Sequence, residues 1–229
     1  MAYRSEAPTI AGFVQQLAVS YVANGYWFYV TGVIPEGKDP RRVDEKLVSK
    51  YELNISKFAR ARRKAAGQAN VQYLRHGRFF ALLATHGTHK FFLPIAQGGE
   101  GERICDCRKV PVKFGSYAVS YRGGHAHVRI ERETFKDLKA YCFQNACHWS
   151  AERMGTLLRD LPFEPYAPVR GQMFELLRGV NRLRKTAGLE LVPNCLRLRR
   201  RVYRPFGESE TGGDTVTLAS NKIAPPAPV

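Results

Sequence analysis

The stretch at residues 79–95, FFALLATHGTHKFFLPI, limits what this chain can fold into more than any other part of the sequence. Apolar residues fill both of its ends, and the polar break His86-Gly87-Thr88-His89 separates them. Apolar runs of this length predict a buried strand, or two strands with a turn between them. A pair of histidines at the edge of such a strand is suited to hold a metal ion or a phosphate. His86 and His89 are therefore the first candidate site residues.

Other stretches also predict strands. Residues 26–34 (YWFYVTGVI) are aromatic and β-branched, and turn residues bound them on both sides. Residues 71–73 and 79–83 predict a hairpin through His76-Gly77, or one long bent strand. Residues 117–121 and 125–130 predict a second hairpin, because Arg122-Gly123-Gly124 between them is a turn signal.

Apolar residues at helical spacing predict the helices. A short helix is expected within residues 13–22, and a longer helical segment over 41–66 breaks near Asn54. The longest helix is predicted over 133–161, with Thr134 as its N-cap, and another over 172–187. Residues 196–203 (LRLRRRVY) alternate apolar residues with arginine, which predicts a basic strand.

This order of elements indicates an α+β fold. We expect a ferredoxin-like β-α-β-β core, followed by a long C-terminal helix, a second, basic helix and a basic strand. The expected division is an N-terminal arm and helix (1–25), an α+β core (26–161), a basic helix–strand extension (169–206) and a disordered tail (207–229). The tail is assigned from its content of Gly, Thr, Asn and Pro.

The charge of the chain points to a polyanionic partner. Lys and Arg number 36 against 20 Asp and Glu, which gives a formal net charge of +16 and a pI near 9.9. Such an excess destabilises a compact chain by self-repulsion unless nucleic acid or an anionic surface relieves it. A solvated charged face is the usual meaning of a single charge run, but the whole-chain excess favours phosphate contact. The candidate contacts are Arg60, Arg62, Arg63, Lys64, Arg178, Arg182, Arg184, Lys185, Arg197, Arg199, Arg200 and Arg201.

Several other classes are disfavoured by the sequence. Five cysteines without a CxxC pair indicate neither a disulfide framework nor a zinc ribbon, so a reducing cytoplasm is expected. The sequence contains no apolar run of membrane-spanning length and no signal-peptide core, so no membrane partner is expected. A conventional hydrolase is not indicated, because Gly-rich phosphate loops, GxSxG and HExxH are absent.

Three interpretations of the histidines are open. The first combines His86 and His89 with Tyr141 and Asn145, which lie four residues apart and so share a face of the predicted long helix. The second uses His125 and His127, which alternate on a predicted strand and share one of its faces. In the third, the histidines are structural or make ordinary phosphate hydrogen bonds.

In layout the first arrangement resembles the HUH endonucleases, and within them the REP-associated and related single-tyrosine transposases. An early strand like Tyr29-Val30-Thr31-Gly32 opens the fold of that family, and a later strand ends in two metal-binding histidines. The resemblance implies that His86 and His89, with the amide of Asn145, hold Mg²⁺ or Mn²⁺. It also implies that Tyr141 attacks a phosphorus atom and forms a covalent phosphotyrosine.

The spacing of the histidines requires one adjustment. Two residues separate His86 from His89, so a regular strand would place them on opposite faces. A bulge at Gly87 is expected to return them to one face, because a bulge adds one residue and glycine favours it.

Three functions follow as hypotheses. The first is a basic nucleic-acid-binding protein, with DNA favoured over RNA. It would be associated with a mobile element or plasmid, and its other partners would be proteins of a nucleoprotein complex. Exposed bases would then stack on aromatic residues such as Tyr73, Tyr117 and Tyr121. The second is a metal-dependent HUH-like nickase or transposase of single-stranded DNA. The third is an RNA-binding component of a ribonucleoprotein.

Overall fold

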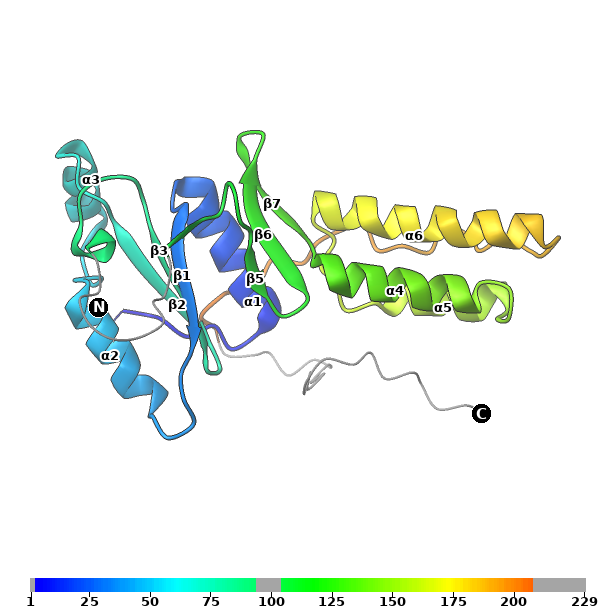
Figure 1. The fold of residues 1–229 in the computed structure, drawn as a ribbon, viewed down its shortest axis with the longest axis horizontal. Helices are drawn as coiled ribbons and strands as arrows, with labels where there is room; N and C mark the ends of the chain where they lie inside the picture. The colour runs from blue at the N-terminus through cyan, green and yellow to red at the C-terminus, as the bar shows by residue number, and fades with distance from the viewer. Residues whose placement is uncertain (1–2, 94–103, 208–229) are drawn as a thin grey trace.

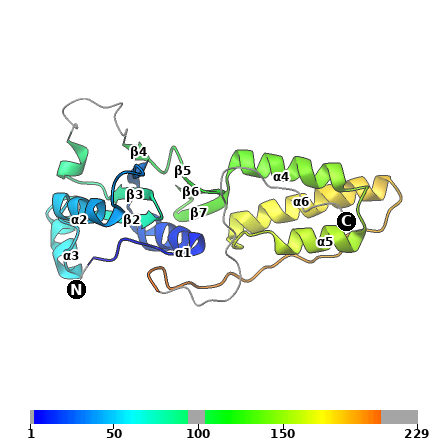
Figure 2. The ribbon, with the colours of Figure 1, turned by 90° about the horizontal axis from the view of Figure 1, so that it is seen from below.

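The computed structural model describes residues 3–93 and 104–207 and shows a mixed α+β fold (Figure 1). The described residues form two antiparallel sheets and six α-helices. The sheets and the first three helices occupy one end of an elongated molecule, and the last three helices occupy the other (Figures 1 and 2). None of the described helices has the length and apolar content to cross a membrane. Apart from residue 207, the predicted tail lies outside the described residues.

The first sheet has the strand order β2-β3-β1-β4. Its strands are β1 (Phe28–Val33), β2 (Val71–His76), β3 (Phe79–Ala84) and β4 (Cys105–Asp106). The predicted hairpin is confirmed, since β2 and β3 pair antiparallel from His76↔Phe79 onward. β1 also pairs antiparallel with β3, so β1 and β2 run parallel to each other with β3 between them. The connection from β1 to β2 carries α2 (Pro40–Lys50) and α3 (Lys57–Ala65), which are separated near Asn54 as predicted.

The second sheet is the predicted hairpin with one added strand. Its order is β5 (Val112–Phe114), β6 (Tyr117–Arg122) and β7 (His125–Ile130). Val119 and Val128 form a cross-strand pair in the core, whereas the neighbouring pair Ser120 and His127 belongs to the opposite, polar face. The sheets join at Cys107, whose N–H donates to the Trp27 carbonyl (2.8 Å) and whose carbonyl accepts from the Tyr121 N–H (3.4 Å).

Two apolar cores lie on the two faces of the first sheet. The larger core lies between this sheet, the second sheet, the N-terminal helix and the last three helices. The smaller core lies on the other face, beneath α2. The N-terminal helix begins as α1 (Ile10–Gln15) and continues as a π-helix, η1 (Gln16–Tyr21), and a 3₁₀ turn, η2 (Val22–Asn24). This confirms the short helix predicted there.

The segment before α1 is held against β2. The Arg75 N–H donates to the Ser5 carbonyl (2.7 Å), and the Ala7 N–H donates to the Arg75 carbonyl (2.8 Å). The buried Arg75 guanidinium also hydrogen-bonds the carboxylates of Asp44 and Glu6. These contacts make residues 5–7 an added partner of the sheet edge.

The single long helix predicted over 133–161 is wrong. The structure has two helices there, α4 (Arg132–Asn145) and α5 (Ala151–Asp160). The cap of α4 is Glu131, which precedes the expected Thr134 and accepts from the backbone N–H of Glu133 and Thr134. Ser150 starts α5 by accepting from the Arg153 N–H. Side-chain capping at Ser150 outweighs the apolar periodicity that runs through the turn.

The last helix, α6 (Ala167–Thr186), lies beside α4 and α5 (Figures 1 and 2). The basic strand predicted over 196–203 is wrong, because residues 189–206 have no regular structure. This segment, which we call the C-terminal strap, runs back along the helices to α1 (Figure 2). Its backbone bonds to side chains: Gln15 Nε2 donates to the Tyr203 carbonyl (2.6 Å), and the Tyr203 N–H donates to Gln15 Oε1 (3.0 Å). These contacts replace the pairing that a strand would need.

Candidate nucleic-acid interface

His86 and His89 lie in the loop after β3, which ends at Ala84. The His86 side chain is exposed, and His89 Nδ1 accepts from the Phe91 N–H (3.0 Å), which starts the 3₁₀ turn η3 (Lys90–Phe92). Burial lowers the pKa of His89, and the nearby Arg63 and Lys90 charges lower it further. This histidine therefore acts as a neutral cap of the turn.

The bulge expected at Gly87 is wrong. Gly87 follows the end of the strand and has a φ of +133°. Its backbone lies against the segment after α3, where the Thr88 N–H donates to the Gly67 carbonyl (3.1 Å) and the Ala69 N–H donates to the Thr88 carbonyl (3.1 Å). A glycine is needed here because a Cβ would lie 2.6 Å from the Gly67 oxygen.

Tyr141 and Asn145 share a face of α4, as their spacing predicts. Asn145 Nδ2 donates to the Tyr141 carbonyl (2.8 Å), and the Tyr141 ring packs edge-on against Trp149, with centroids 5.8 Å apart. The helix α4 belongs to the helical end of the molecule, whereas the loop after β3 lies beside α3 at the other end (Figures 1 and 2). The structure therefore does not bring these two residues together with His86 and His89.

The alternative pair, His125 and His127, shares a face of β7. His127 Nδ1 is buried and has no hydrogen-bond partner among the residues that the structure describes. Burial lowers the pKa of His127, and the Arg122 and Arg129 charges lower it further. Across the described part of the chain, no three His, Cys, Asp or Glu side chains come together as they would around an ion such as the expected Mg²⁺ or Mn²⁺.

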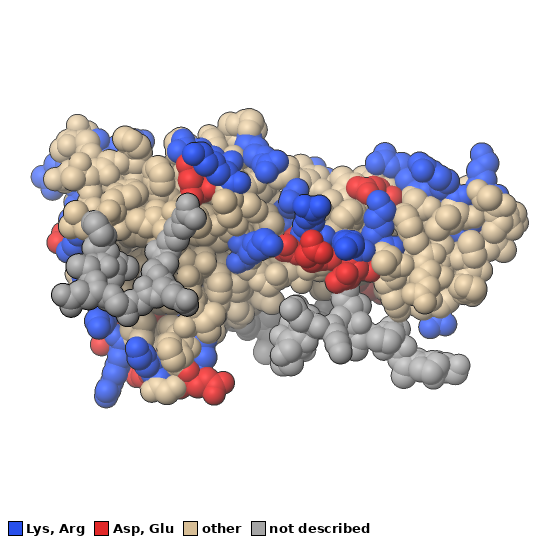
Figure 3. All heavy atoms as spheres, viewed as in Figure 1, with Lys and Arg blue, Asp and Glu red and all other residues tan. Residues whose placement is uncertain are grey.

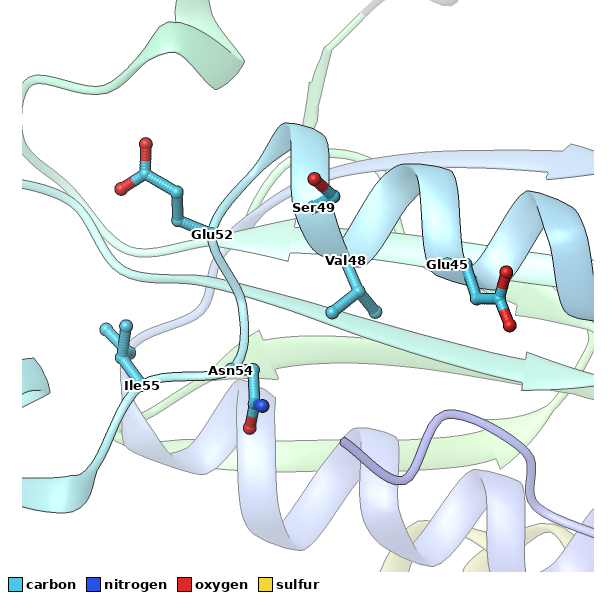
Figure 4. Close-up of a pocket in the computed structure, with 6 residues that line it drawn as sticks. All are labelled: Glu45, Val48, Ser49, Glu52, Asn54 and Ile55. Atoms are coloured by element: carbon cyan, nitrogen blue, oxygen red, sulfur yellow. The ribbon is translucent and has the colours of Figure 1, made fainter. Parts of the chain in front are cut away.

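A shallow hollow lies between α2 and the segment that leads to α3 (Figure 4). Its lining consists of Glu45, Val48, Ser49, Glu52, Asn54 and Ile55. Glu52 forms ion pairs with Arg63 (2.6 Å) and Lys90 (3.0 Å), and these hydrogen bonds lower its pKa. Carboxylates at this hollow do not suit a polyanion.

The basic run at the end of α3 is only partly free to contact phosphate. Arg63 pairs with Glu52, and Arg60 donates to the Ile55 carbonyl (2.8 Å). Arg62 and Lys64 are exposed and form no ion pair with any described carboxylate. Half of this run therefore serves the local structure.

On α6 the predicted contacts divide in the same way. Arg178, Arg182 and Lys185 form an exposed stripe at a spacing of four and three residues. Arg184 is buried, with 3% of its surface exposed, and its guanidinium donates to the carbonyls of Ala146 and Trp149. The phosphate-contact role expected for Arg184 does not agree with this burial, because all of these donors face the protein interior.

The arginines of the C-terminal strap also differ from one another. Arg197, Arg199 and Arg201 are exposed, although Arg197 also donates to the Leu161 carbonyl (3.1 Å). Arg200 is half-buried, lies 4.9 Å from the centroid of the Tyr166 ring and donates to Gln15 Oε1. Arg200 therefore fastens the strap to the body of the protein.

Figure 3 shows Lys and Arg side chains gathered over β6 and β7, over α4 and over the outer part of α6, with a few carboxylates between them. Two ion pairs lie in this region, Lys113–Glu131 (2.7 Å) and Lys139–Glu175 (2.7 Å). The cations that form no ion pair within the described ranges make up what we call the basic band. Its members on β6, β7, α4 and α6 are Arg122, Arg129, Arg132, Lys136, Arg178, Arg182 and Lys185.

Sequence reasoning missed the first four members of this band. The signals were present, because Arg129 alternates with apolar residues along its strand and Arg132 and Lys136 lie one helical turn apart. They were missed because these residues are dispersed in the sequence and come to lie on one surface only where β7 leads into α4.

Protein-family models, curated proteins and solved structures were all compared with the chain, and none of them matches it. The surface and its side chains therefore carry the functional inference.

Proposed function

We propose that the protein binds nucleic acid through the basic band. The observation that carries this proposal is the set of band cations without carboxylate partners, on a chain whose net charge is +16. Lys and Arg that neutralise phosphates release condensed counterions, which drives sequence-independent binding. DNA is the first ligand to test, and RNA within a ribonucleoprotein is the alternative.

The band offers a defined electrostatic signature. If all seven cations contact phosphates, the logarithm of the binding constant should fall with the logarithm of salt concentration with a slope of about −5 to −6. The stripe Arg178, Arg182 and Lys185 should account for about two to three units of that slope.

The experiment measures the affinity of the full chain for single-stranded and duplex oligonucleotides over a series of salt concentrations. Replacing the stripe with R178Q/R182Q/K185Q should weaken binding and flatten the slope. A matched variant, R62Q/K64Q, removes two exposed cations from α3 at the other end of the molecule and should change the slope much less. Affinity that does not respond to salt, or an equal loss in both variants, would contradict the proposal.

We also infer that the first sheet is a ferredoxin-like core. The order β2-β3-β1-β4, with parallel β1 and β2 flanking β3, supports this inference, since it is the arrangement of a split β-α-β unit. Between β3 and β4 the described residues contain only the 3₁₀ turn η3, in place of a second crossover helix.

A further inference from the structure

One of the two tryptophans of the chain lies in a cluster of rings and cations where the two sheets meet. The Arg108 guanidinium lies 4.4 Å from the centroid of the Trp27 ring, and the Tyr121 ring lies 5.0 Å from it. Both aromatic rings are partly exposed, and Arg108 is exposed. We call these three residues the Trp27 platform.

The backbone holds the platform in place. The Cys107 N–H donates to the Trp27 carbonyl, and the Tyr121 N–H donates to the Cys107 carbonyl. Trp27, which directly precedes β1, and Tyr121 of β6 therefore lie on either side of Cys107. The Asp106 carboxylate accepts three hydrogen bonds from the Arg108 guanidinium, at 3.0 Å, 3.1 Å and 2.7 Å. The guanidinium plane is thus oriented before any ligand arrives, and these bonds lower the pKa of Asp106.

Further rings extend the cluster around Arg108. The Phe28 ring lies 5.7 Å from the Arg108 guanidinium and packs edge-on against Phe92, at 5.3 Å. His86 lies 6.5 Å from Phe28 and is exposed. The histidine singled out in the sequence therefore belongs to an aromatic surface.

One polar atom of the platform is closed to solvent. Trp27 Nε1 is buried and has no hydrogen-bond acceptor among the described residues. Buried indole N–H groups usually find a partner, and one left unpaired is costly. A ligand can therefore contact the exposed part of the Trp27 ring but not this edge.

We propose that the Trp27 platform binds an unpaired base of a single-stranded nucleic acid. Base–aromatic stacking tolerates any base because every base has a π-face, and a planar guanidinium adds cation–π attraction. Arg122, a member of the basic band, is the last residue of the strand that carries Tyr121 and is exposed, so the platform adjoins one end of the band. This inference rests on the proposed function and adds to it the single-stranded form of the ligand.

Two of the other tyrosines considered for stacking are not available. Tyr73 is fully buried and donates to Asp44 Oδ1 (2.6 Å). Tyr117 is buried, and its hydroxyl accepts from the Glu164 N–H (2.8 Å). Only Tyr121 of the three lies at a partly exposed, cation-lined surface.

The two tryptophans allow a direct test. The chain has only two, Trp27 and Trp149, so W149F leaves Trp27 as the single indole emitter and W27F leaves Trp149. Trp149 is a matched control because it also has an arginine over its ring, Arg153 at 4.1 Å, and a tyrosine beside it, Tyr141. Each variant is titrated with a thymidine oligonucleotide, a duplex and heparin, with binding followed in parallel by competition against a labelled strand.

Stacking predicts saturable quenching of W149F fluorescence by the single strand, little quenching by heparin, and little quenching of W27F by either. W27A should weaken single-strand binding by about 5- to 150-fold, the effect of losing one stacked base, and duplex binding much less. R108A in the W149F background should reduce the quenching, and R108K should not restore it, because an ammonium lacks the planar stacking surface.

The outcomes separate the two proposals. Binding of the single strand without quenching in W149F, or equal quenching in W27F, would overturn the platform and leave the basic band standing. Failure of both nucleic acids to bind any of the proteins would overturn the proposed function itself. Far-UV circular dichroism of each variant confirms that the fold is retained.

Discussion

The Arg184 guanidinium at the end of α6 donates a 2.7 Å hydrogen bond to the carbonyl oxygen of Ala146, just beyond the end of α4. The same nitrogen donates to the Trp149 carbonyl (2.7 Å), and Nε donates to the Glu190 carbonyl. One buried cation therefore holds the turn between α4 and α5, the end of α6 and the start of the C-terminal strap. A charge that helps to make the chain basic is used here to satisfy carbonyl groups at the end of α4, in the turn before α5 and in the strap.

Arg184→Ala is expected to destabilise the protein by about 2–4 kcal/mol, because it leaves buried carbonyl oxygens without donors. Arg182→Ala, at an exposed position on the same helix, should change the free energy of unfolding by less than about 0.5 kcal/mol. Urea unfolding measures both. In the oligonucleotide-binding assay the order should reverse. Arg182→Ala removes an exposed cation and should weaken binding, whereas Arg184→Lys changes a buried position and should weaken binding less. Equal stability of the two alanine variants would show that the buried bonds contribute nothing.

Gly87→Ala is expected to lower the free energy of unfolding by more than about 3 kcal/mol, because strain at positive φ adds to a backbone clash. The φ is +133°, and a Cβ would lie 2.6 Å from both the Ala69 nitrogen and the Gly67 oxygen. Gly77→Ala is the matched control, since Gly77 also has a positive φ (+55°) but has no atom within 4 Å of a Cβ. That change should cost about 1 kcal/mol. Thermal unfolding of the two proteins compares them, and similar losses would contradict the close approach.

Nucleic-acid binding should strengthen as the pH falls through the ordinary range of histidine, about 6.5. In the free protein, burial and the charges of Arg122 and Arg129 lower the pKa of His127, so its imidazole is neutral near pH 7. A bound phosphate favours the imidazolium and raises that pKa, so binding takes up a proton and protonation favours the complex. His127→Asn should flatten this dependence of affinity on pH, whereas His86→Asn should not. If His127→Asn binds with the same dependence of affinity on pH as the wild type, no phosphate lies next to His127 in the complex.

Tyr141→Phe is expected to leave both stability and binding nearly unchanged. The phenyl ring keeps the edge contact with Trp149, and the Asn145 amide bonds the backbone carbonyl of residue 141, which the substitution retains. Incubation with labelled single-stranded DNA and Mn²⁺, followed by denaturing electrophoresis, tests the tyrosine directly. A covalent adduct in the wild type that disappears in Tyr141→Phe would establish nucleophilic chemistry and require α4 to approach a metal-binding group.

The strands were the most predictable part of the fold. β1, the β2–β3 hairpin and the β6–β7 hairpin lie where aromatic and β-branched runs meet Gly-containing turns, because these signals are local. The long helix and the basic strand were not predictable in the same way. A side-chain cap at Ser150 divides the first. Two hydrogen bonds between the Gln15 side chain and the backbone of Tyr203, 188 positions away, replace the second.

The mixed α+β class, the positions of the turns and the surplus of positive charge could all be read from the amino-acid sequence, since each follows from residues that are close together or simply counted. Which arginines face solvent and which, like Arg184, complete the interior became known only from the folded arrangement. The same arrangement also decided that Trp27, Arg108 and Tyr121 meet at the junction of the two sheets. Burial and ring stacking depend on which segments pack together. Trp27 is 81 positions from Arg108 and 94 from Tyr121, so these residues share a surface only once the two sheets are joined.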